Sequence, residues 1–424
     1  MWRPDGARPR RSSILHSIHL SPETLLQLAP GVRTRLDAGG HVLLDAANGT
    51  VVDLGPRGYS VLALFSRPLA LGTAIDRVER EAPATDFAPT MSIIDILLEE
   101  GVLVQPGGGR APTSGWADPV EHARMLHDDR RTRDYLAAIA EAVRPGDVVL
   151  EIGTGSGVLA IAAARAGARR VYAIEGSDIA EVAERVFAAN GVDDRVTLVP
   201  GWSRQVELPE QADLLVSEVI GNEPLEEEIL ETTLDARRRL LKPDARLIPH
   251  TLTLLARPLL LPESDARQRA IGRAAVERWR RLYDMEFQPL LEASIPGPVN
   301  MPTEAEVAAT WPPVGPAVAL AELNLSAFEE ASVRASADLV VDAPGSVNAV
   351  AVTFRAALYG MVAHTLDPWT WPTSSWAVSV WVLPDQLDLV PETALRVRYH
   401  RRFPGARDGL SCEIVERGAP LDSE

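Results

Sequence analysis

The middle of this chain alternates short hydrophobic runs with helical patterns. The stretches with the composition of buried strands are Val148–Ile152, Arg170–Ile174, Val196–Val199 and Leu214–Ser217. Helices are predicted between them, at Val158–Ala166 and Ile179–Asn190. This alternation is typical of a parallel sheet with crossover helices. We therefore expect an α/β domain over residues 117–250.

The flanking regions have different patterns. Residues 14–106 predict a small α+β unit, with strands at Val32–Leu36, His41–Leu44, Thr50–Leu54 and Val102–Val104, and helices at Pro56–Phe65, Leu71–Glu81 and Ala88–Glu100. Residues 107–116 have the glycine and proline content of a linker, and residues 1–13 of a disordered tail. From residue 251 to 424 the pattern is mostly of strands, at Thr253–Ala256, Asp338–Val341, Ala349–Ala356, Trp376–Val382 and Ala394–Tyr399, with a helical insertion at about 263–283.

Composition narrows the class of protein. The net charge of −17 argues against general affinity for nucleic acid or an anionic membrane surface. Cys412 is the only cysteine, so no internal disulfide is expected, and neither is a zinc cluster. The sequence has no run of about 18 apolar residues and no apolar signal core near Met1. We expect a cytoplasmic protein without a metal.

A glycine-rich turn follows the first strand of the α/β region. Gly153, Gly155 and Gly157 lie where that strand gives way to a helix, and glycine lets a ligand pack against bare backbone. The spacing is G-x-G-x-G, which differs from the dinucleotide fingerprint G-x-G-x-x-G. Glu175 ends the next strand, where its carboxylate can accept hydrogen bonds from two ribose hydroxyls. Glu151 ends the first strand, where it can meet an ammonium group. Together these residues predict a site for S-adenosylmethionine.

Two glutamates nine residues apart follow the fourth strand, within Ser217-Glu-Val-Ile-Gly-Asn-Glu-Pro-Leu-Glu-Glu-Glu228. Here the chain resembles the protein arginine methyltransferases, whose "double-E" loop has this spacing, and the resemblance extends from about Trp116 to Arg417. It implies that Glu218 and Glu227 bind the acceptor guanidinium. Two carboxylates can hold a guanidinium through paired hydrogen bonds and turn one nitrogen towards a sulfonium methyl group.

The same resemblance assigns further residues. It places Met125 beside the methyl donor, pairs Arg131 with the cofactor carboxylate and puts Ser203 near the adenine. It matches Asp128 and Trp376 to the family's catalytic aspartate and Thr-His-Trp loop. It implies a class I, Rossmann-like α/β methyltransferase domain, a C-terminal β-barrel domain, and a homodimer formed through a helical arm that includes Glu277–Tyr283.

The chain departs from the family in the Thr-His-Trp loop. That loop is Ser374-Ser375-Trp376 here, so the histidine is missing and Asp128 has no histidine partner from it. The upstream Tyr-Phe-x-x-Tyr motif is reduced to Trp116. These changes put the histidine–aspartate proton relay in doubt, while methyl transfer itself does not depend on them.

Residues 14–106 resemble the PqqD-like domains, which bind the leader of ribosomally made precursor peptides. The matching stretches are Leu20-Ser-Pro22, Val32–Asp37, Val42–Ala46 and Val52–Gly58. The resemblance implies that a leader peptide adds a strand to a sheet edge. A winged-helix-like DNA reader has nearly the same pattern, but six Arg against eleven Asp or Glu between Ser13 and Pro106 give −5, and DNA binding favours a basic face. An inert structural cap is the third interpretation.

Three functions follow from these observations. The first is an enzyme that methylates arginine in a precursor peptide held by residues 14–106. The second is the same fold acting on an amine, a carboxylate or an imidazole, suggested by the missing histidine. The third is a DNA-binding, ligand-sensing regulator with an inactive methyltransferase fold, against which the retained Glu218 and Glu227 argue.

Overall fold

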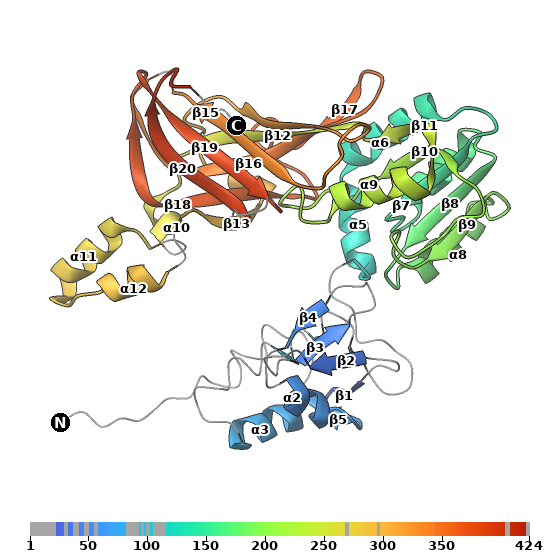
Figure 1. Ribbon diagram of the computed structural model, residues 1–424, viewed down its shortest axis with the longest axis horizontal. Helices are drawn as coiled ribbons and strands as arrows, with labels where there is room; N and C mark the ends of the chain where they lie inside the picture. Colours follow the sequence, from blue (N-terminus) through green and yellow to red (C-terminus); the bar gives the residue numbers. More distant parts are fainter. Residues whose placement is uncertain are drawn as a thin grey trace. The chain divides into compact units, whose positions relative to one another are not determined.

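The computed structural model divides the chain into two compact units, Met1–Glu121 and His122–Glu424. Figure 1 shows the elements of each. The residues it describes are 23–28, 33–36, 42–45, 51–54, 58–81, 93–94, 97–98, 102–104, 116–267, 271–294, 297–341, 343–402 and 408–420. The predicted tail (1–13) and most of the predicted linker (107–115) lie outside these ranges. None of the helices in these ranges is long and apolar enough to cross a bilayer.

The described part of the first unit contains two small antiparallel sheets, two full helices and helical residues at 93–94 and 97–98. Its elements are β1 (Leu25–Leu28), β2 (Arg33–Leu36), β3 (Val42–Asp45), β4 (Val51–Asp53), α2 (Gly58–Leu64), β5 (Leu69–Ala70), α3 (Leu71–Glu81) and β6 (Leu103–Val104). The strand orders are β2-β3-β4 and β5-β1-β6. The three predicted hairpin strands and the first two predicted helices are confirmed. Strands β1 and β5 were not predicted, because a Leu-Leu-Gln-Leu run and a two-residue strand show no clear alternation of apolar and polar residues.

A buried core unites the first unit. Phe65, Leu26 and Leu71 are fully buried in it, together with Ile94 and Leu97. The last two belong to the third predicted helix, which lies largely outside the described residues. The buried apolar residues described in this small unit form one cluster.

The second unit begins with a five-stranded parallel sheet in the order β11-β10-β7-β8-β9. Its strands are β7 (Val148–Ile152), β8 (Arg170–Glu175), β9 (Val196–Pro200), β10 (Ala212–Ser217) and β11 (Leu241–Ile248). The four predicted strands are confirmed. The fifth, β11, was missed because Lys242, Pro243 and Asp244 interrupt its apolar pattern.

The order of the strands determines where this sheet can bind a ligand. From β7 the chain continues to β8 and β9 on one side, and then returns to β10 and β11 on the other. Loops therefore diverge at the carboxyl ends of β7 and β10, which is where open parallel sheets bind ligands. The accompanying helices are α5 (Pro119–His127), α6 (Asp129–Ala142), α7 (Val158–Arg165), α8 (Ala180–Ala189) and α9 (Ile229–Arg239).

The rest of the second unit is built mainly from two antiparallel sheets. The larger contains β13 (Val299–Glu304), β18 (Ala377–Leu389), β16 (Gly345–Tyr359), β12 (Thr251–Leu259), β14 (Val318–Asn324) and β17 (Val362–Thr365); the smaller contains β15 (Val333–Leu339), β19 (Thr393–Arg401) and β20 (Gly409–Glu416). Residues of both sheets and of the parallel sheet share one hydrophobic core. The predicted strand-rich region is confirmed, but the strand expected at 338–341 lies earlier, at Val333–Leu339, because β19 pairs along that whole stretch.

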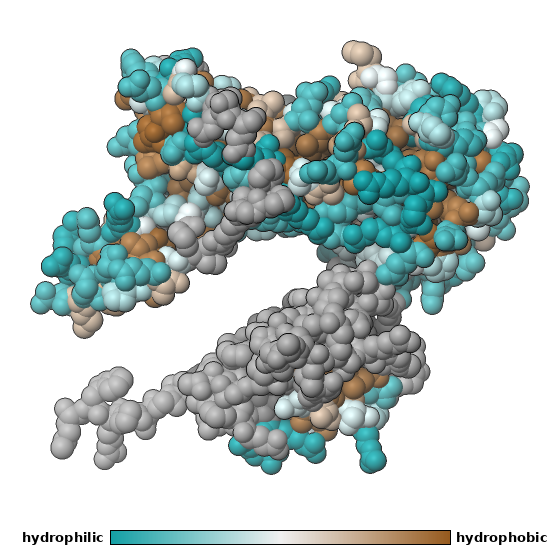
Figure 2. Space-filling view, in the orientation of Figure 1, coloured by the Kyte–Doolittle hydropathy of each residue, from teal (hydrophilic) through white to brown (hydrophobic). Residues whose placement is uncertain are grey.

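Helices α10 (Glu263–Arg267), α11 (Arg273–Tyr283) and α12 (Gln288–Ala293) form the insertion, with a short α13 (Ala305–Ala308) further along the chain. The predicted helical insertion at about 263–283 is confirmed by α10 and α11, and the backbone is extended at Gly272, just before α11. In Figure 2 hydrophobic atoms are visible between the charged surfaces of α11 and α12. Leu282, Tyr283 and Met285 are each more than half exposed. We call residues 273–293 the arm.

Candidate functional site

The glycine turn has the backbone geometry that only glycine adopts easily. Gly153, Gly155 and Gly157 have φ values of +78°, +53° and +87°. A Cβ atom on Gly155 would lie 2.8 Å from the His122 ring, and one on Gly153 would lie 2.9 Å from Val219. The turn therefore presents bare backbone between neighbouring side chains, and a side chain at these positions would fill that space.

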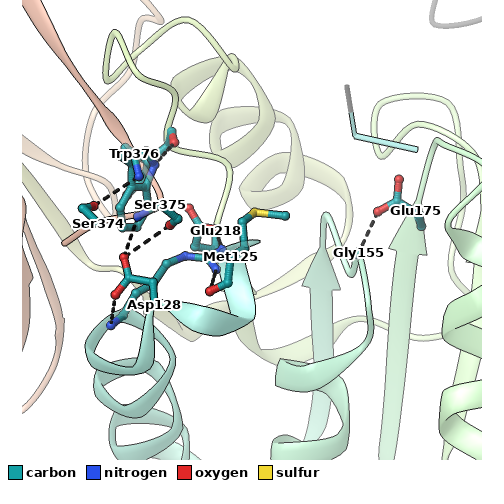
Figure 3. A network of polar contacts seen from close by, with 10 residues as sticks. Met125, Asp128, Gly155, Glu175, Glu218, Ser374, Ser375 and Trp376 are labelled. Carbon is teal, nitrogen blue, oxygen red and sulfur yellow. Dashed lines mark hydrogen bonds and ion pairs between the residues drawn. The ribbon is translucent and has the colours of Figure 1, made fainter. Parts of the chain in front are cut away.

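Glu175 closes the turn from the end of β8. Its Oε2 accepts a 2.9 Å hydrogen bond from the Gly155 N–H, and its Oε1 accepts a 2.8 Å bond from the Ser177 N–H (Figure 3). Two backbone donors thus fix the carboxylate in one plane. Each oxygen keeps a second lone pair, with which it can accept a hydroxyl hydrogen.

Glu151, at the end of β7, is a buried acid with an unused oxygen. The side chain is 1% exposed, its Oε2 accepts a hydrogen bond from the Thr154 hydroxyl, and its Oε1 has no partner among the described residues. Burial raises the pKa of Glu151 to about 8. Nearby, the buried Ser217 hydroxyl also lacks a partner within the described part of the chain. A buried acid in this state is suited to receive a cation.

An aromatic ring lies beside the turn after β8. A Cβ atom on Gly176 would lie 2.8 Å from the Trp202 indole, which is 43% exposed. Ser203, the predicted adenine neighbour, is buried, and its carbonyl accepts a 3.0 Å hydrogen bond from Arg239. Trp202 was missed by the sequence analysis, although its position next to Ser203 could have indicated it.

The two glutamates of the predicted acceptor site lie in a loop after β10. We call residues 217–228 the acceptor loop. The Arg131 guanidinium contacts Glu218 Oε2 as an ion pair, and both side chains are nearly buried. Arg131 Nη1 also donates to the Met125 carbonyl at 3.4 Å. Its contact with a cofactor carboxylate stays a prediction.

Glu227 lies in the electrostatic field of the same cation. Burial, together with the nearby Glu226, raises its pKa to about 7, and Arg131 acts in the opposite direction. Glu218 is therefore paired with a guanidinium, whereas Glu227 titrates near neutrality.

Residues far along the chain support the acceptor loop. The Trp376 indole donates to the Ile220 carbonyl at 2.6 Å, and the Ala377 N–H donates to Asn222 Oδ1 at 2.8 Å. At the other end of the loop, the Tyr399 hydroxyl donates to Glu223 Oε1 at 2.5 Å. The sequence analysis missed Tyr399, because nothing local in β19 marks it.

Helix α5 lies beside the glycine turn, and Arg131 of α6 contacts Glu218 of the acceptor loop. In Figure 3 the Met125 side chain extends from the neighbourhood of Glu218 and Trp376 towards Gly155. His122, one helical turn before Met125, is buried against Gly155. The sequence analysis missed His122; its i, i+3 spacing to Met125 was the available signal.

Asp128 has a partner that the sequence analysis did not foresee. Its Oδ2 accepts hydrogen bonds from the Ser375 N–H at 2.9 Å and the Ser375 hydroxyl at 3.3 Å, and its Oδ1 caps α6 at the Arg131 N–H. Ser375, which the resemblance matches to the family's histidine, thus holds the loop through Asp128. Trp116, by contrast, is half-exposed in the first unit.

Comparison with known proteins places these residues in a wider context. The family model of ribosomal protein L11 methyltransferase (PrmA) matches residues 129–249. A probable protein arginine N-methyltransferase 6 from Arabidopsis thaliana is 30% identical over 229 residues, 53% of this chain and 51% of its own length. A protein arginine N-methyltransferase 1 from Schizosaccharomyces pombe is 35% identical over 172 residues, 40% of this chain and 48% of its own. The chain spans about half the length, or less, of the curated relatives it matches.

Solved structures show the fold. Arabidopsis thaliana protein arginine methyltransferase 10 superposes with a TM-score of 0.58 at 22% identity, covering 72% of this chain and 96% of that one. The Trypanosoma brucei PRMT1 enzyme-prozyme heterotetramer with AdoHcy gives a TM-score of 0.56 at 23% identity, covering 70% and 98%. The predicted Rossmann-like α/β domain followed by a sheet-rich domain is confirmed. The winged-helix-like class of residues 14–106 stays a prediction.

Proposed function

We propose that this chain is an S-adenosylmethionine-dependent methyltransferase whose acceptor is an arginine guanidinium in a polypeptide. One observation carries the proposal. Glu218, in the acceptor loop, forms an ion pair with Arg131 of α6, and the Met125 side chain extends from the neighbourhood of Glu218 towards the glycine turn. The proposal is supported by the similarity to arginine methyltransferases in sequence and in fold.

The residues at the glycine turn fit the proposed cofactor. Glu151 has a buried oxygen without a partner among the described residues, which suits the ammonium of the methionine moiety. Glu175 would accept the ribose hydroxyls, and Trp202 with Ser203 would border the adenine. The cofactor supplies an electrophilic methyl group on a sulfonium. The chain would orient the cofactor and the acceptor, and burial excludes water from the glutamates that hold them.

The acceptor loop would bind and orient the guanidinium. Glu218 Oε2 is already paired with the planar guanidinium of Arg131, so Oε1 would receive the acceptor. Glu227 would hold a second nitrogen, because two carboxylates match the paired donors of a guanidinium. Both acids draw positive charge away from the reacting nitrogen and leave its lone pair more available.

Glu227 would also remove the proton. After the methyl group has moved to nitrogen, that nitrogen carries an extra proton, which must leave. A carboxylate with a pKa raised to about 7 is a better base than an ordinary glutamate. The His–Asp relay is not required for this step.

The direct test is a mass measurement on an arginine-containing peptide incubated with the protein and S-adenosylmethionine. The proposal expects a gain of about 14 Da, located on a guanidinium nitrogen by tandem mass spectrometry. A methyl group on an amine, a carboxylate or an imidazole would select the second function above, and the absence of any gain would contradict both.

Glu218→Gln provides the matched variant. The neutral amide keeps the shape of the side chain but removes the charge that holds the guanidinium. We expect transfer to fall about 1,000-fold, since removing one such electrostatic group costs about 10²–10³ in rate. Cofactor affinity should stay within threefold of the wild type.

We further propose that residues 14–106 bind the leader of a ribosomally made precursor peptide. The meander β2-β3-β4 supports this, because an antiparallel sheet with free edges can accept a peptide as an added strand. Tethering would then raise the local concentration of the segment to be methylated, to about millimolar for a short flexible connection.

Paired substrates test the leader hypothesis. The precursor encoded beside this gene would be compared with the same core lacking its leader. We expect KM to rise about 100-fold without the leader while kcat changes little. Equal KM values for the two substrates would refute leader binding and leave the methyltransferase proposal intact.

We also propose that the arm joins two copies of this chain. Leu282, Tyr283 and Met285 are more than half exposed on it, and burying them against a second copy would remove apolar surface from water. Sedimentation should show a dimer at micromolar concentration. A monomer at that concentration would exclude this use of the arm.

A further inference from the structure

A histidine–aspartate pair with a buried histidine packs against Trp376, which contacts the acceptor loop, and neither of its residues was named in the sequence analysis. His364, on β17, makes a 2.9 Å contact from Nδ1 to Oδ2 of Asp134, on α6. The histidine side chain is 4% exposed and the aspartate side chain 27%. Such a pair is costly to bury unless it is well hydrogen-bonded, so its position requires an explanation.

The ring of His364 packs against the tryptophan that supports the acceptor loop. Its centroid is 5.3 Å from that of Trp376, and the two planes are inclined by 39°. Phe354 completes the cluster, with its centroid 5.0 Å from Trp376 in an edge-on arrangement. Contacts of this kind hold an indole in one orientation.

Trp376 transmits that orientation to both sides of the proposed acceptor site. Its indole N–H donates to the Ile220 carbonyl, two residues after Glu218. Its ring lies 5.2 Å from the Arg131 guanidinium carbon, a cation–π distance, and Arg131 contacts Glu218. His364 is therefore one side chain away from the groups that hold Glu218.

Residues of α6 and its N-cap hold Trp376 in place through two separate contacts. Asp128, Arg131 and Asp134 follow one another at intervals of three residues along the start of α6, so they form a stripe on one side of the helix. Asp128 holds Ser375, the residue before Trp376, and Asp134 holds His364 against the Trp376 ring. Arg131 lies between them, on Glu218.

We propose that His364 and Asp134 are positioning residues for methyl transfer: they fix the plane of Trp376, and through it the positions of Arg131 and the acceptor loop. This rests on the proposed function. Neither residue contacts the reacting atoms. Their effect is to keep Glu218 in the orientation that presents the acceptor, where a displacement of about 1 Å can cost about 100-fold in rate.

The charge state of the pair is consistent with this role. Burial lowers the pKa of His364, while Asp134 raises it, Arg130 lowers it and Asp128 raises it. A lowered pKa favours the neutral imidazole, which adds no second cation next to Trp376 beside Arg131. The pair therefore acts by geometry.

Four variants separate the hydrogen bond from the packing. His364→Phe keeps a ring against Trp376 and removes the hydrogen bond. Asp134→Leu removes the acceptor, and Asp134→Asn keeps one in its amide oxygen. The fourth is the His364→Phe/Asp134→Leu double variant. We expect kcat to fall about tenfold in each of the first two and in the double variant alike, because one shared interaction is lost. Asp134→Asn should recover most of the rate.

The controls define a positioning effect. KM for S-adenosylmethionine should stay within twofold throughout, because the glycine turn is untouched. His400→Phe, on β19, replaces a partly exposed histidine away from Trp376 and should keep kcat within twofold. Additive losses in the double variant, or an equal rise in the cofactor KM, would overturn the proposal.

A second readout does not depend on catalysis. The indole ¹H–¹⁵N signal of Trp376, assigned by its loss in Trp376→Phe, should move in the same direction in His364→Phe and Asp134→Leu, and stay in place in His400→Phe. An unmoved signal in folded variants would refute the proposal, even if the rate fell. If the wild type transfers no methyl group, the proposed function fails, and this signal still decides whether the pair orients Trp376.

Discussion

The two halves of the proposed active site are built in different ways. The glycine turn is made from residues close together in the sequence: Gly155 and Glu175, joined by a hydrogen bond, are 20 residues apart. The acceptor loop depends on distant partners, since Trp376 and Ile220 are 156 residues apart and Tyr399 and Glu223 are 176 apart. The glycine turn should therefore tolerate substitutions elsewhere in the chain, whereas the acceptor loop depends on the fold of the whole second unit.

The largest effect on cofactor binding is expected from Gly155→Ala, which should weaken S-adenosylmethionine binding about 30-fold. Alanine would have to adopt the left-handed backbone conformation at φ +53°, which a Cβ atom disfavours. That Cβ atom would also lie 2.8 Å from the His122 ring. Calorimetric titration measures the change.

Gly191→Ala is the matched control for that variant. Gly191 has φ +63°, but a Cβ there would meet no atom within 4 Å. It should lose stability through the same backbone cost and keep cofactor affinity within twofold. Equal losses of affinity in the two variants would show that the turn does not contact the cofactor.

The next effect tests the remote half. Tyr399→Phe removes the hydroxyl that donates to Glu223, and so leaves a buried carboxylate short of a donor. We expect kcat to fall about tenfold, because the acceptor loop loses one of its anchors, while cofactor affinity stays unchanged. A rate within twofold of the wild type, measured at saturating cofactor, would show that β19 does not position the loop.

A smaller effect concerns protons at the local half. Burial raises the pKa of Glu151 to about 8, so at pH 7 this acid is largely protonated without a cation beside it. An ammonium would favour the charged form, and binding at pH 7 should release close to one proton. Titrations in buffers of different ionisation enthalpy measure that release, which should disappear in Glu151→Gln.

The same raised pKa makes a prediction for stability. The folded chain binds more protons than the unfolded chain between about pH 4.5 and pH 8, so the contribution of Glu151 to stability falls as the pH rises through that window. Glu151→Gln should therefore raise Tm at pH 8 relative to the wild type and have little effect at pH 4.5. A Tm difference that does not change with pH would contradict the burial of this charge.

The smallest effect is expected at the rim of the acceptor loop. Arg204 pairs with Glu228, but the arginine side chain is 44% exposed and the glutamate 33%. Solvent-exposed ion pairs contribute about 0–1 kcal/mol. Arg204→Ala should thus change kcat and Tm little, within twofold and within about 3 °C for a chain of this size. A large loss of activity would show that the exposed Arg204–Glu228 pair also takes part in function.

What could be predicted from the sequence follows the same division. Four strands of the parallel sheet, the glycine turn and Glu175 were predicted because buried parallel strands form continuous apolar runs and glycine marks a special backbone. The spacing of Glu218 and Glu227 was visible for the same reason, since both lie in one short segment.

The remainder could not be predicted, because its determinants are tertiary. Nothing in β17 or β19 distinguishes His364 or Tyr399 from other residues of strands. Their roles depend on which helix or loop packs against them. The missing loop histidine was noted, but the sequence did not reveal that Ser375 would bind Asp128 in its place.

The central claim is that one half binds the cofactor and the other presents the acceptor. The most direct test measures single-turnover methyl transfer in Gly155→Ala and Glu218→Gln side by side, from low to saturating S-adenosylmethionine. The account predicts that Gly155→Ala regains nearly the wild-type rate at saturation, while Glu218→Gln stays about 1,000-fold slow at every concentration. If both variants recovered, or neither did, the two halves would not have separate roles.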